Sequence, residues 1–472
     1  MFKSSWLQQN EGYARQLLVC CSVSILPFVY GLLEMWPSLS IERVLDGAAG
    51  FPVTEAEISV IVTMPTLAEA ITPLALGFVL VNVGRKTNLL LNAIVYILAW
   101  VLITFAECPL YLVVAHFIAG FGSAIVLIIG PIFLSEIADK SNRGALVSIY
   151  ITAVSVGQIF FTGIGIYISY YVLNWIALVL AVLALLCLIA FVTESPYWFM
   201  IRRDDKKAEE SFRYYRNPTA GEGEEQVKAA LAEVRATVET EMLSASSYRE
   251  MFGNPSNIQA SIIVIALSIF QGACGIIAIL TYASTTLPKY DGFWQPNPTI
   301  AVVSILNLVT NIISVGLIDT LGRKPLTILS NGGNALGTAI VAFYYVIDEY
   351  TDYDTTDIKW VPYVGLLVFI SFYGLAMATI PHLLAGELFP ANVRYQANVI
   401  STICFAGSCA FFNYIYLGVC HSVGVSVMFG LFTFFNVAAT VFSCVYVFET
   451  KNLTLAEIQL LAAGKVQQRG AA

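Results

Sequence analysis

Charged residues recur in two copies of one short pattern, and the chemistry open to them is ion pairing at helix ends. The tripeptide "GRK" occurs twice, each time between apolar runs. Each copy is followed by a glutamate and an arginine seven residues apart, first Glu136 with Arg143 and then Glu387 with Arg394. Each half closes on another glutamate, in "TESPYW" and in "FETKNLT". Arg85 and Arg323 leave helix ends in short turns, so we expect each to reach a carboxylate on a neighbouring helix. The available acids are Glu136, Glu387, Glu194 and Glu449.

We interpret these charges as a conformational latch in a duplicated six-helix unit. Two such halves around a midplane cavity are typical of alternating-access transporters. We expect the pairs to tie the cytoplasmic helix ends together in the outward-open state and to break when that side opens. The alternative is that they only anchor helix ends at the lipid headgroups. The latch residues are Arg85, Lys86, Glu136, Arg143, Glu194, Asp319, Arg323, Lys324, Glu387, Arg394 and Glu449.

Two carboxylates lie inside apolar runs and offer proton chemistry instead. Glu34 and Glu69 are surrounded by hydrophobic residues, and an ionisable group within a membrane span suggests a function because its burial is costly. Glu34 could pair with His116 as a protonatable couple. The alternative, which we favour, is that Glu34 is hydrated near the outer mouth beside Trp36. Transport would then be facilitative and not coupled to protons.

The elements that position these residues must be membrane-spanning helices. The chain has 472 residues, of which 58% are hydrophobic and only 12% charged, whereas soluble domains carry about 25% charged residues. A span needs about 20 apolar residues, and without water its backbone must be helical. We therefore predict an all-α membrane protein with twelve transmembrane helices, at residues 16–37, 56–82, 87–107, 109–135, 145–170, 172–192, 257–283, 297–318, 325–346, 361–386, 396–418 and 424–447.

The spans divide into two six-helix bundles, 1–192 and 257–472, joined by a charged linker at 193–256. Apolar residues in the linker fall near one helical stripe, which favours short surface helices over a solvated loop. With both termini in the cytoplasm, the outer loops carry only three of the 24 cations, Arg43, Lys289 and Lys359. Positive residues favour the inner side, so we predict a multi-pass plasma-membrane protein with cytoplasmic termini. The N-terminus shows no removable signal peptide.

Several other kinds of site are disfavoured. Most of the nine cysteines fall inside spans and the three histidines are far apart, which argues against a disulfide framework or a metal site. We expect no cofactor. The basic clusters are interrupted by acids and sit at helix ends, so no nucleic-acid partner is expected. No nucleophile and base share a face, which disfavours an enzyme. The oligomeric state stays open.

The motif set "GRK", "EIADKSNRG", "TESPYW", "GRK", "GELFPANVR" and "FETK" closely resembles the sugar porter family of the major facilitator superfamily. The stretch "GLLEMWPSLS" looks like the insect branch that includes facilitated trehalose and glucose transporter-like proteins. The resemblance covers nearly the whole chain. It implies a twelve-helix carrier with two pseudo-repeated bundles that moves a sugar, trehalose or a hexose, across the bilayer.

A sugar site needs buried amides, hydroxyls and an aromatic face, because each dehydrated hydroxyl requires a partner. Where the family carries two glutamines and an asparagine in its seventh span, this chain keeps Gln271 but has Gly272 and Ile277. Asn307 in the eighth span is retained. The substrate-binding candidates, by resemblance and residue type, are Gln271, Asn307, Asn311, Tyr282, His382 and Trp36.

Other family positions are altered, and the predicted cavity is more apolar than a hexose site. Family amides or acids fall on Ile151, Gly374 and Phe405, the fourth-span arginine falls on His116, and the first hinge has lost the acid that Asp319 keeps in the second. Two alternatives to a facilitative sugar transporter therefore stay open. One is a carrier of a less hydroxylated small molecule. The other is a non-transporting sensor paralogue, although a static receptor needs no bistable hinge.

Overall fold

The computed structural model describes residues 2–75, 83–139, 142–216, 231–232, 234–236, 248–289, 295–451, 453 and 455–462. Regular structure in these residues is helical, with no strand among them. Twelve of the helical segments are long and apolar enough to cross a membrane. The predicted all-α fold with twelve spans is confirmed. Residues 76–82, which end the predicted second span and include Val81 and Asn82, lie outside the described part.

The first six spans are α1 (Phe2–Leu45), α2 (Glu55–Ala75), α4 (Arg85–Thr104), α5 (Pro109–Ile137), α6 (Arg143–Gly165) and α7 (Tyr170–Phe191). The second six are built from α12 (Pro255–Ala273) with α13 (Ile276–Thr286), α14 (Pro296–Leu321), α15 (Arg323–Tyr350), α16 (Val361–Phe372) with η2 (Tyr373–Met377) and α17 (Ile380–Glu387), α18 (Ala391–Ser422) and α19 (Val425–Tyr446).

Two of the predicted spans are broken in the middle. The seventh separates into α12 and α13 at Gly275, whose φ of 93° is left-handed and favours glycine. In the tenth, the five residues of η2 form a π-helix between α16 and α17. A π-helical turn frequently marks a functional site. Both breaks lie within spans of the second bundle, away from the ends of those spans.

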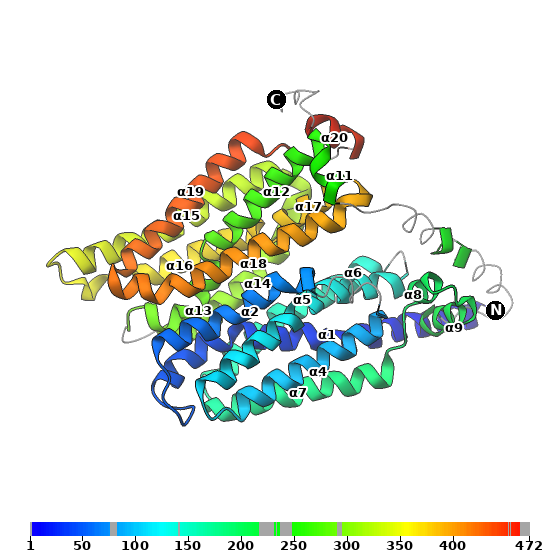
Figure 1. Ribbon diagram of the computed structural model, residues 1–472, viewed down its shortest axis with the longest axis horizontal. Coiled ribbons are helices and arrows are strands. Elements are labelled where there is room, and N and C mark those ends of the chain that lie inside the picture. Colours follow the sequence, from blue (N-terminus) through cyan, green and yellow to red (C-terminus); the bar gives the residue numbers. More distant parts are fainter. Residues whose placement is uncertain are drawn as a thin grey trace.

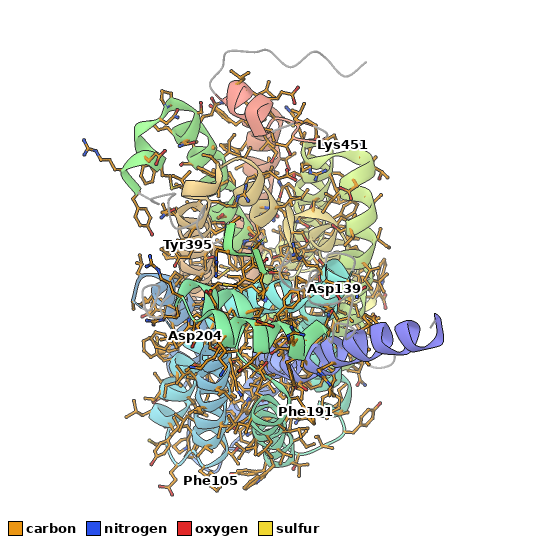
Figure 2. The ribbon with its side chains drawn as sticks, turned by 90° about the vertical axis from the view of Figure 1, so that its right-hand side faces the viewer. Phe105, Asp139, Phe191, Asp204, Tyr395 and Lys451 are labelled. Atoms are coloured by element: carbon orange, nitrogen blue, oxygen red, sulfur yellow. The ribbon has the colours of Figure 1, made fainter. Side chains whose placement is uncertain are left out.

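Figure 1 shows the two sets of helices one above the other, the first below and the second above. At one end, on the right, lie the short helices α8 (Pro196–Ile201), α9 (Asp205–Arg216), α11 (Tyr248–Gly253) and α20 (Leu455–Ala462). Both "GRK" turns belong to this end, and we call it the inner end and the opposite one the outer end. Figure 2 looks onto the inner end, with Lys451 and Tyr395 of the second set above Asp139 and Asp204 of the first.

The hydrophobic core differs between the two ends. One large buried cluster is continuous across both bundles and joins residues such as Leu39 and Ile61 of the first to Leu280 and Phe432 of the second. The inner part of the second bundle has a separate cluster around Ile263, Leu384 and Phe389. The bundles therefore share a core toward the outer end only.

Part of the predicted linker is described, and it is helical. Leu231 and Val234, two residues of the predicted apolar stripe, pack with Met200 and Ala208 in a small cluster of their own. Val227 and Val238 of the same stripe lie outside the described residues. The domain boundaries at 192/193 and 256/257 stay predictions.

Glycine lets α1 and α6 cross at backbone contact. A Cβ on Gly157 would lie 2.2 Å from the carbonyl oxygen of Phe28, and one on Gly31 would lie 2.2 Å from that of Val154. Small residues at such crossings allow the close packing that holds membrane helices together. The reciprocal pair fixes α1 against α6, and so fixes the orientation of Glu34 and Gln158 described below.

We expect Gly157→Leu to destabilise the first bundle by about 1–3 kcal/mol, because the two helices must move apart. The measurement is the thermal melting temperature of the purified protein in detergent. Gly163→Leu, on the same helix, is the control because a Cβ there meets nothing within 4 Å. Equal melting temperatures for the two variants would contradict the crossing as a structural constraint.

Candidate functional site

The first set of predicted latch residues forms one cluster at the inner end. Arg85, at the start of α4, donates to Glu136 at the end of α5, with Nη2 and Oε1 3.1 Å apart. The Glu194 carboxylate accepts from the backbone N–H of Lys86 at 3.0 Å. The N-terminus of a helix favours such an anion. Gly84 makes room, since a Cβ there would lie 2.0 Å from Glu194 Oε2.

The second set repeats this geometry in the other bundle. Arg323 Nη2 is 2.9 Å from Glu387 Oε1, and the Glu449 carboxylate accepts from the backbone N–H groups of Arg323 and Lys324 at 2.9 and 3.0 Å. Gly322 again lies against the carboxylate. Asp319 is 3.5 Å from Arg323 Nη1 but 78% exposed, so this third pair is peripheral.

Sequence reasoning missed one member of each cluster. The hydroxyl of Ser195 donates to Glu136 Oε2, and the hydroxyl of Thr450 donates to Glu387 Oε2 at 2.6 Å. The available signal was that a hydroxyl residue directly follows the closing glutamate in both halves. These bonds satisfy the carboxylate oxygen that the arginine does not reach.

Two predicted latch residues stand apart from these clusters. Arg143 and Arg394 are exposed, and neither guanidinium forms an ion pair with a residue that the structure describes. Arg394 reaches only the carbonyl oxygen of Phe389, at 3.5 Å. The acids seven residues before them, Glu136 and Glu387, bind Arg85 and Arg323 of neighbouring helices, as expected for those two arginines.

The clusters tie helix ends together, and each does so within one bundle. Every ion pair above joins residues of the same bundle. Each cluster therefore binds the helix ends of its bundle into a unit that can move as a body. The expected break of these pairs when the inner end opens stays a prediction.

Contacts between the bundles gather at the outer end. His421 Nδ1 at the end of α18 is 2.9 Å from Glu55 Oε2 at the start of α2, and Lys289 Nζ is 2.8 Å from Glu42 Oε1. The Glu42 carboxylate raises the pKa of Lys289. In addition, Ser38 donates to the carbonyl oxygen of Leu280.

Within the described ranges, the hydrogen bonds and ion pairs that cross between the bundles all belong to this region, which we call the outer seal.

Two of the predicted substrate residues, Tyr282 and His382, differ in their exposure. Tyr282 is fully buried in the seal: its ring stacks on Tyr416 with centroids 4.7 Å apart, and its hydroxyl donates to the carbonyl oxygen of Asn413 at 3.2 Å. His382 is exposed, and its ring meets that of Phe405 edge-on.

A polar centre lies at the breaks of the second bundle. Gln271, three residues before the Cys274–Gly275 break, is 1% exposed and its Oε1 has no hydrogen-bond partner. The Tyr373 hydroxyl of η2 lies beside it. Next along η2, Gly374 packs against Thr310 and Asn307 of α14. Asn311 Nδ2 donates to Asn307 Oδ1 at 3.0 Å, so these two amides partly satisfy each other.

The first bundle also has polar side chains within its spans, among them two carboxylates. Glu34 Oε2 accepts from Gln158 Nε2 at 2.8 Å. Glu69 is 7% exposed, and its carboxylate makes no hydrogen bond to a described residue. Sequence reasoning did not identify Gln158. It looked for the family's fifth-span glutamine at Ile151, and Gln158 lies two helical turns further along the same stripe of α6.

The predicted couple of Glu34 with His116 is wrong, and Trp36 does not line a cavity. Trp36 is fully buried in the first bundle, where its ring lies 4.6 Å from that of His116 and its Nε1 donates to Asn174 Oδ1 at 3.1 Å. Residues two apart on a helix point in nearly opposite directions. Since Trp36 points toward His116, Glu34 points away from it.

Comparison with known proteins agrees with this arrangement. A family model described as "Sugar (and other) transporter" matches residues 7–462. The chain belongs to this family. It is 26% identical over 459 residues to sugar transporter ERD6-like 2 of Arabidopsis thaliana, with 96% of this chain and 95% of the relative covered. It is 25% identical to the facilitated trehalose transporter Tret1 of Culex quinquefasciatus, with 96% and 87% covered.

Solved structures confirm the major facilitator fold. The inward open conformation of the xylose transporter XylE from E. coli superimposes with a TM-score of 0.77, at 21% identity, over 95% of this chain and 99% of that one. The same protein bound to 6-bromo-6-deoxy-D-glucose gives 0.67. Membership of the sugar (and other) transporter family confirms the predicted class of function, membrane transport by alternating access. Its characterised relatives are transporters, which is a non-enzyme class.

Within this transporter, we expect Arg323→Ala and Arg85→Ala to lower both melting temperature and transport. Each change leaves a largely buried glutamate without its cation, which should lower the free energy of unfolding by about 3 kcal/mol. The measurements are thermal melting and uptake, with the amount of protein in the membrane as reference. Asp319→Asn is the control, because its carboxylate is mostly exposed. Wild-type melting and uptake in Arg323→Ala would contradict a role for the clusters.

We expect Glu42→Gln to ease opening of the outer seal, because it removes the ion pair with Lys289. Exposed ion pairs contribute about 0.2–1 kcal/mol, so outward opening should quicken roughly 1.4- to 5-fold. Labelling of Ser59→Cys by a membrane-impermeant thiol reagent measures the opening, with Glu107→Gln in the exposed turn between α4 and α5 as the control. Labelling of the Glu42→Gln protein at the control rate would contradict a role for this pair in the seal.

Proposed function

We propose that the chain is a facilitative sugar carrier, with trehalose or a hexose as cargo. The observation that carries the proposal is Gln271: a buried amide oxygen without a partner, three residues before a break in the seventh span. Discontinuous helices form the substrate sites of many transporters. An amide both donates and accepts hydrogen bonds, as a sugar hydroxyl does.

The other residues of the proposed site come from both bundles. Asn307 and Asn311 extend the polar centre along α14, while Glu34 and Gln158 reach it from the first bundle. The relatives named as sugar transporters and as trehalose transporters support a sugar cargo. A closed outer end with bundle-internal clusters at the inner end supports rocking of two rigid bodies. His382 and Tyr282 are kept as candidates that would reach the cargo in other states.

We further propose residence in the plasma membrane with both termini in the cytoplasm. The support is the distribution of Lys and Arg, since all but three of the cations fall on the inner side in this orientation and positive residues favour that side. The lipid bilayer is then a permanent partner of the carrier.

A second candidate cargo is a less hydroxylated small molecule. Gly272 faces α18, where a Cβ would lie 2.7 Å from that of Ser408 and 2.8 Å from the Phe405 carbonyl oxygen. A glutamine therefore cannot be restored at position 272 without separating two helices. This close packing, with Ile277 at the other altered position, leaves fewer amides for hydroxyl groups.

The test is uptake of labelled trehalose and D-glucose into proteoliposomes, with Gln271→Leu as the variant. An unpaired buried hydroxyl costs about 1–3 kcal/mol, so we expect half-saturation to weaken roughly 5- to 150-fold. Flux should equilibrate the sugar without accumulation under an imposed proton gradient. Unchanged half-saturation in Gln271→Leu would contradict a sugar contact there, and accumulation driven by protons would contradict facilitative transport.

A further inference from the structure

Two carboxylates face the seam between the bundles without a cation. Glu34 on α1 accepts one hydrogen bond, from Gln158, and Glu69 on α2 accepts none from the residues that the structure describes. Glu34 lies one helical turn from Ser38, which donates to the Leu280 carbonyl oxygen across the seam. Glu69 lies two turns from Val62, whose carbonyl oxygen accepts from Asn413 of the second bundle. Residues at these spacings share a helix face, so both carboxylates are on faces turned toward the second bundle, and the charge of Glu34 acts on Glu69. No described Lys, Arg or His forms an ion pair with either. Elsewhere in the molecule, carboxylates at comparable burial have arginine partners.

Such a pair is unfavourable unless a positive charge joins it. Two like charges near one another in a medium of low polarity cannot both stay ionised, and an ionisable group at this depth is costly when alone. Either protons or a bound cation must therefore neutralise the pair. The seam is a place that cargo can reach, because it separates the two bundles that move.

An independent observation lies across the seam, in the second bundle. Gln271 Oε1, 99% removed from solvent, has no donor. Its neighbour Gly272 packs against Phe405 and Ser408 of α18, and α18 in turn binds α2, the helix of Glu69, through Asn413. The two bundles thus present unsatisfied acceptors toward one region, and those acceptors require donors.

We propose that these residues, Glu34, Glu69 and Gln271, form a site for a protonated amino group, and that the carrier prefers an amino sugar as cargo. An ammonium group carries one positive charge and three N–H donors. It would supply the missing charge to the two carboxylates and a donor to the Gln271 oxygen. Neutral sugar hydroxyls supply donors but no charge. This inference rests on the proposed sugar transport and narrows its substrate class.

A divalent metal ion fits these residues less well. Hard cations take six or more oxygen ligands, and the described residues contain no group of three acidic, histidine or cysteine side chains that could hold a metal. A polyol fits less well too, because hydroxyl donors leave the two carboxylates without a counter-charge. Two neighbouring carboxylates that share one proton carry a single negative charge, and one ammonium group balances it. Its three N–H donors equal in number the three side chains of the site.

The experiment compares D-glucosamine with D-glucose, which differ in having an amino group or a hydroxyl at carbon 2. Unlabelled competitors inhibit uptake of labelled D-glucose into proteoliposomes at about pH 6.5, where such an amine is mostly protonated. We expect half-inhibition by glucosamine at a concentration about tenfold lower than for glucose, because bonds to ionised groups are roughly twice as strong as neutral ones. Thermal stabilisation of the purified protein by each sugar gives a readout that does not depend on transport.

The matched variants are Glu34→Gln and Glu69→Gln, which keep side-chain size and remove charge. Each should reduce the tenfold preference to about one, both in uptake and in thermal stabilisation, and the ratio for each variant is taken against its own inhibition and stabilisation by glucose. Glu107→Gln, in the exposed turn between α4 and α5, is the control and should keep the preference. N-acetyl-D-glucosamine, which has a neutral amide at carbon 2, should compete no better than glucose.

Three outcomes would overturn the inference. Equal inhibition by glucosamine and glucose would show that the carboxylates do not recognise an amine, while the proposed sugar transport would stand. Glucose accumulation under a proton gradient that is lost in Glu34→Gln would identify the missing charge as a proton. If labelled glucose and labelled glucosamine both fail to enter and neither stabilises the protein, the proposed sugar transport itself is wrong.

Discussion

The scarcity of water inside the bilayer is the constraint on which the rest of this structure depends. Backbone polar groups can be satisfied there only within helices, and a charge there needs a partner supplied by the protein. Arg85 and Arg323 meet this demand at the inner end, where each lies against a glutamate whose other oxygen accepts from a hydroxyl. The charged residues thus cross-link helix ends and leave the spans apolar.

The same constraint separates two kinds of contact that alternating access requires. Contacts within a bundle must survive the motion, and these are the ones built from buried arginine–glutamate pairs and helix N-termini. Contacts between bundles must form and break. In the outer seal they are exposed pairs, such as Lys289 with Glu42 and His421 with Glu55, together with single hydrogen bonds. Exposed pairs contribute little each, which suits an interface that has to open.

Much of this organisation could be predicted from the sequence because it depends on local patterns. Hydropathy placed twelve spans, and the ordered repeat of "GRK" and its acids identified two equivalent bundles. That Arg85 and Arg323 reach carboxylates on neighbouring helices could be predicted too. Which of the available glutamates each arginine binds could not, and neither could the hydroxyl of Ser195 or Thr450 beside them. Chain spacing says which residues reach the same membrane edge, but the packing of neighbouring helices decides which of them meet.

Within a single helix of the site, the sequence also could not predict which side chains face the same surroundings. Glu34 and Trp36 were placed beside each other from the sequence, yet a helix turns about 100° per residue and sends them to different surroundings. Which of them faces the seam depends on the rotation of α1. That rotation is fixed by the crossing at Gly31 and Gly157, a contact between residues far apart in the chain. Trp36 consequently fills the first bundle beside His116 and Asn174. Glu34 instead accepts a hydrogen bond from Gln158. The glycine crossing therefore does more than allow close packing, because it determines which side chain of α1 lies against Gln158.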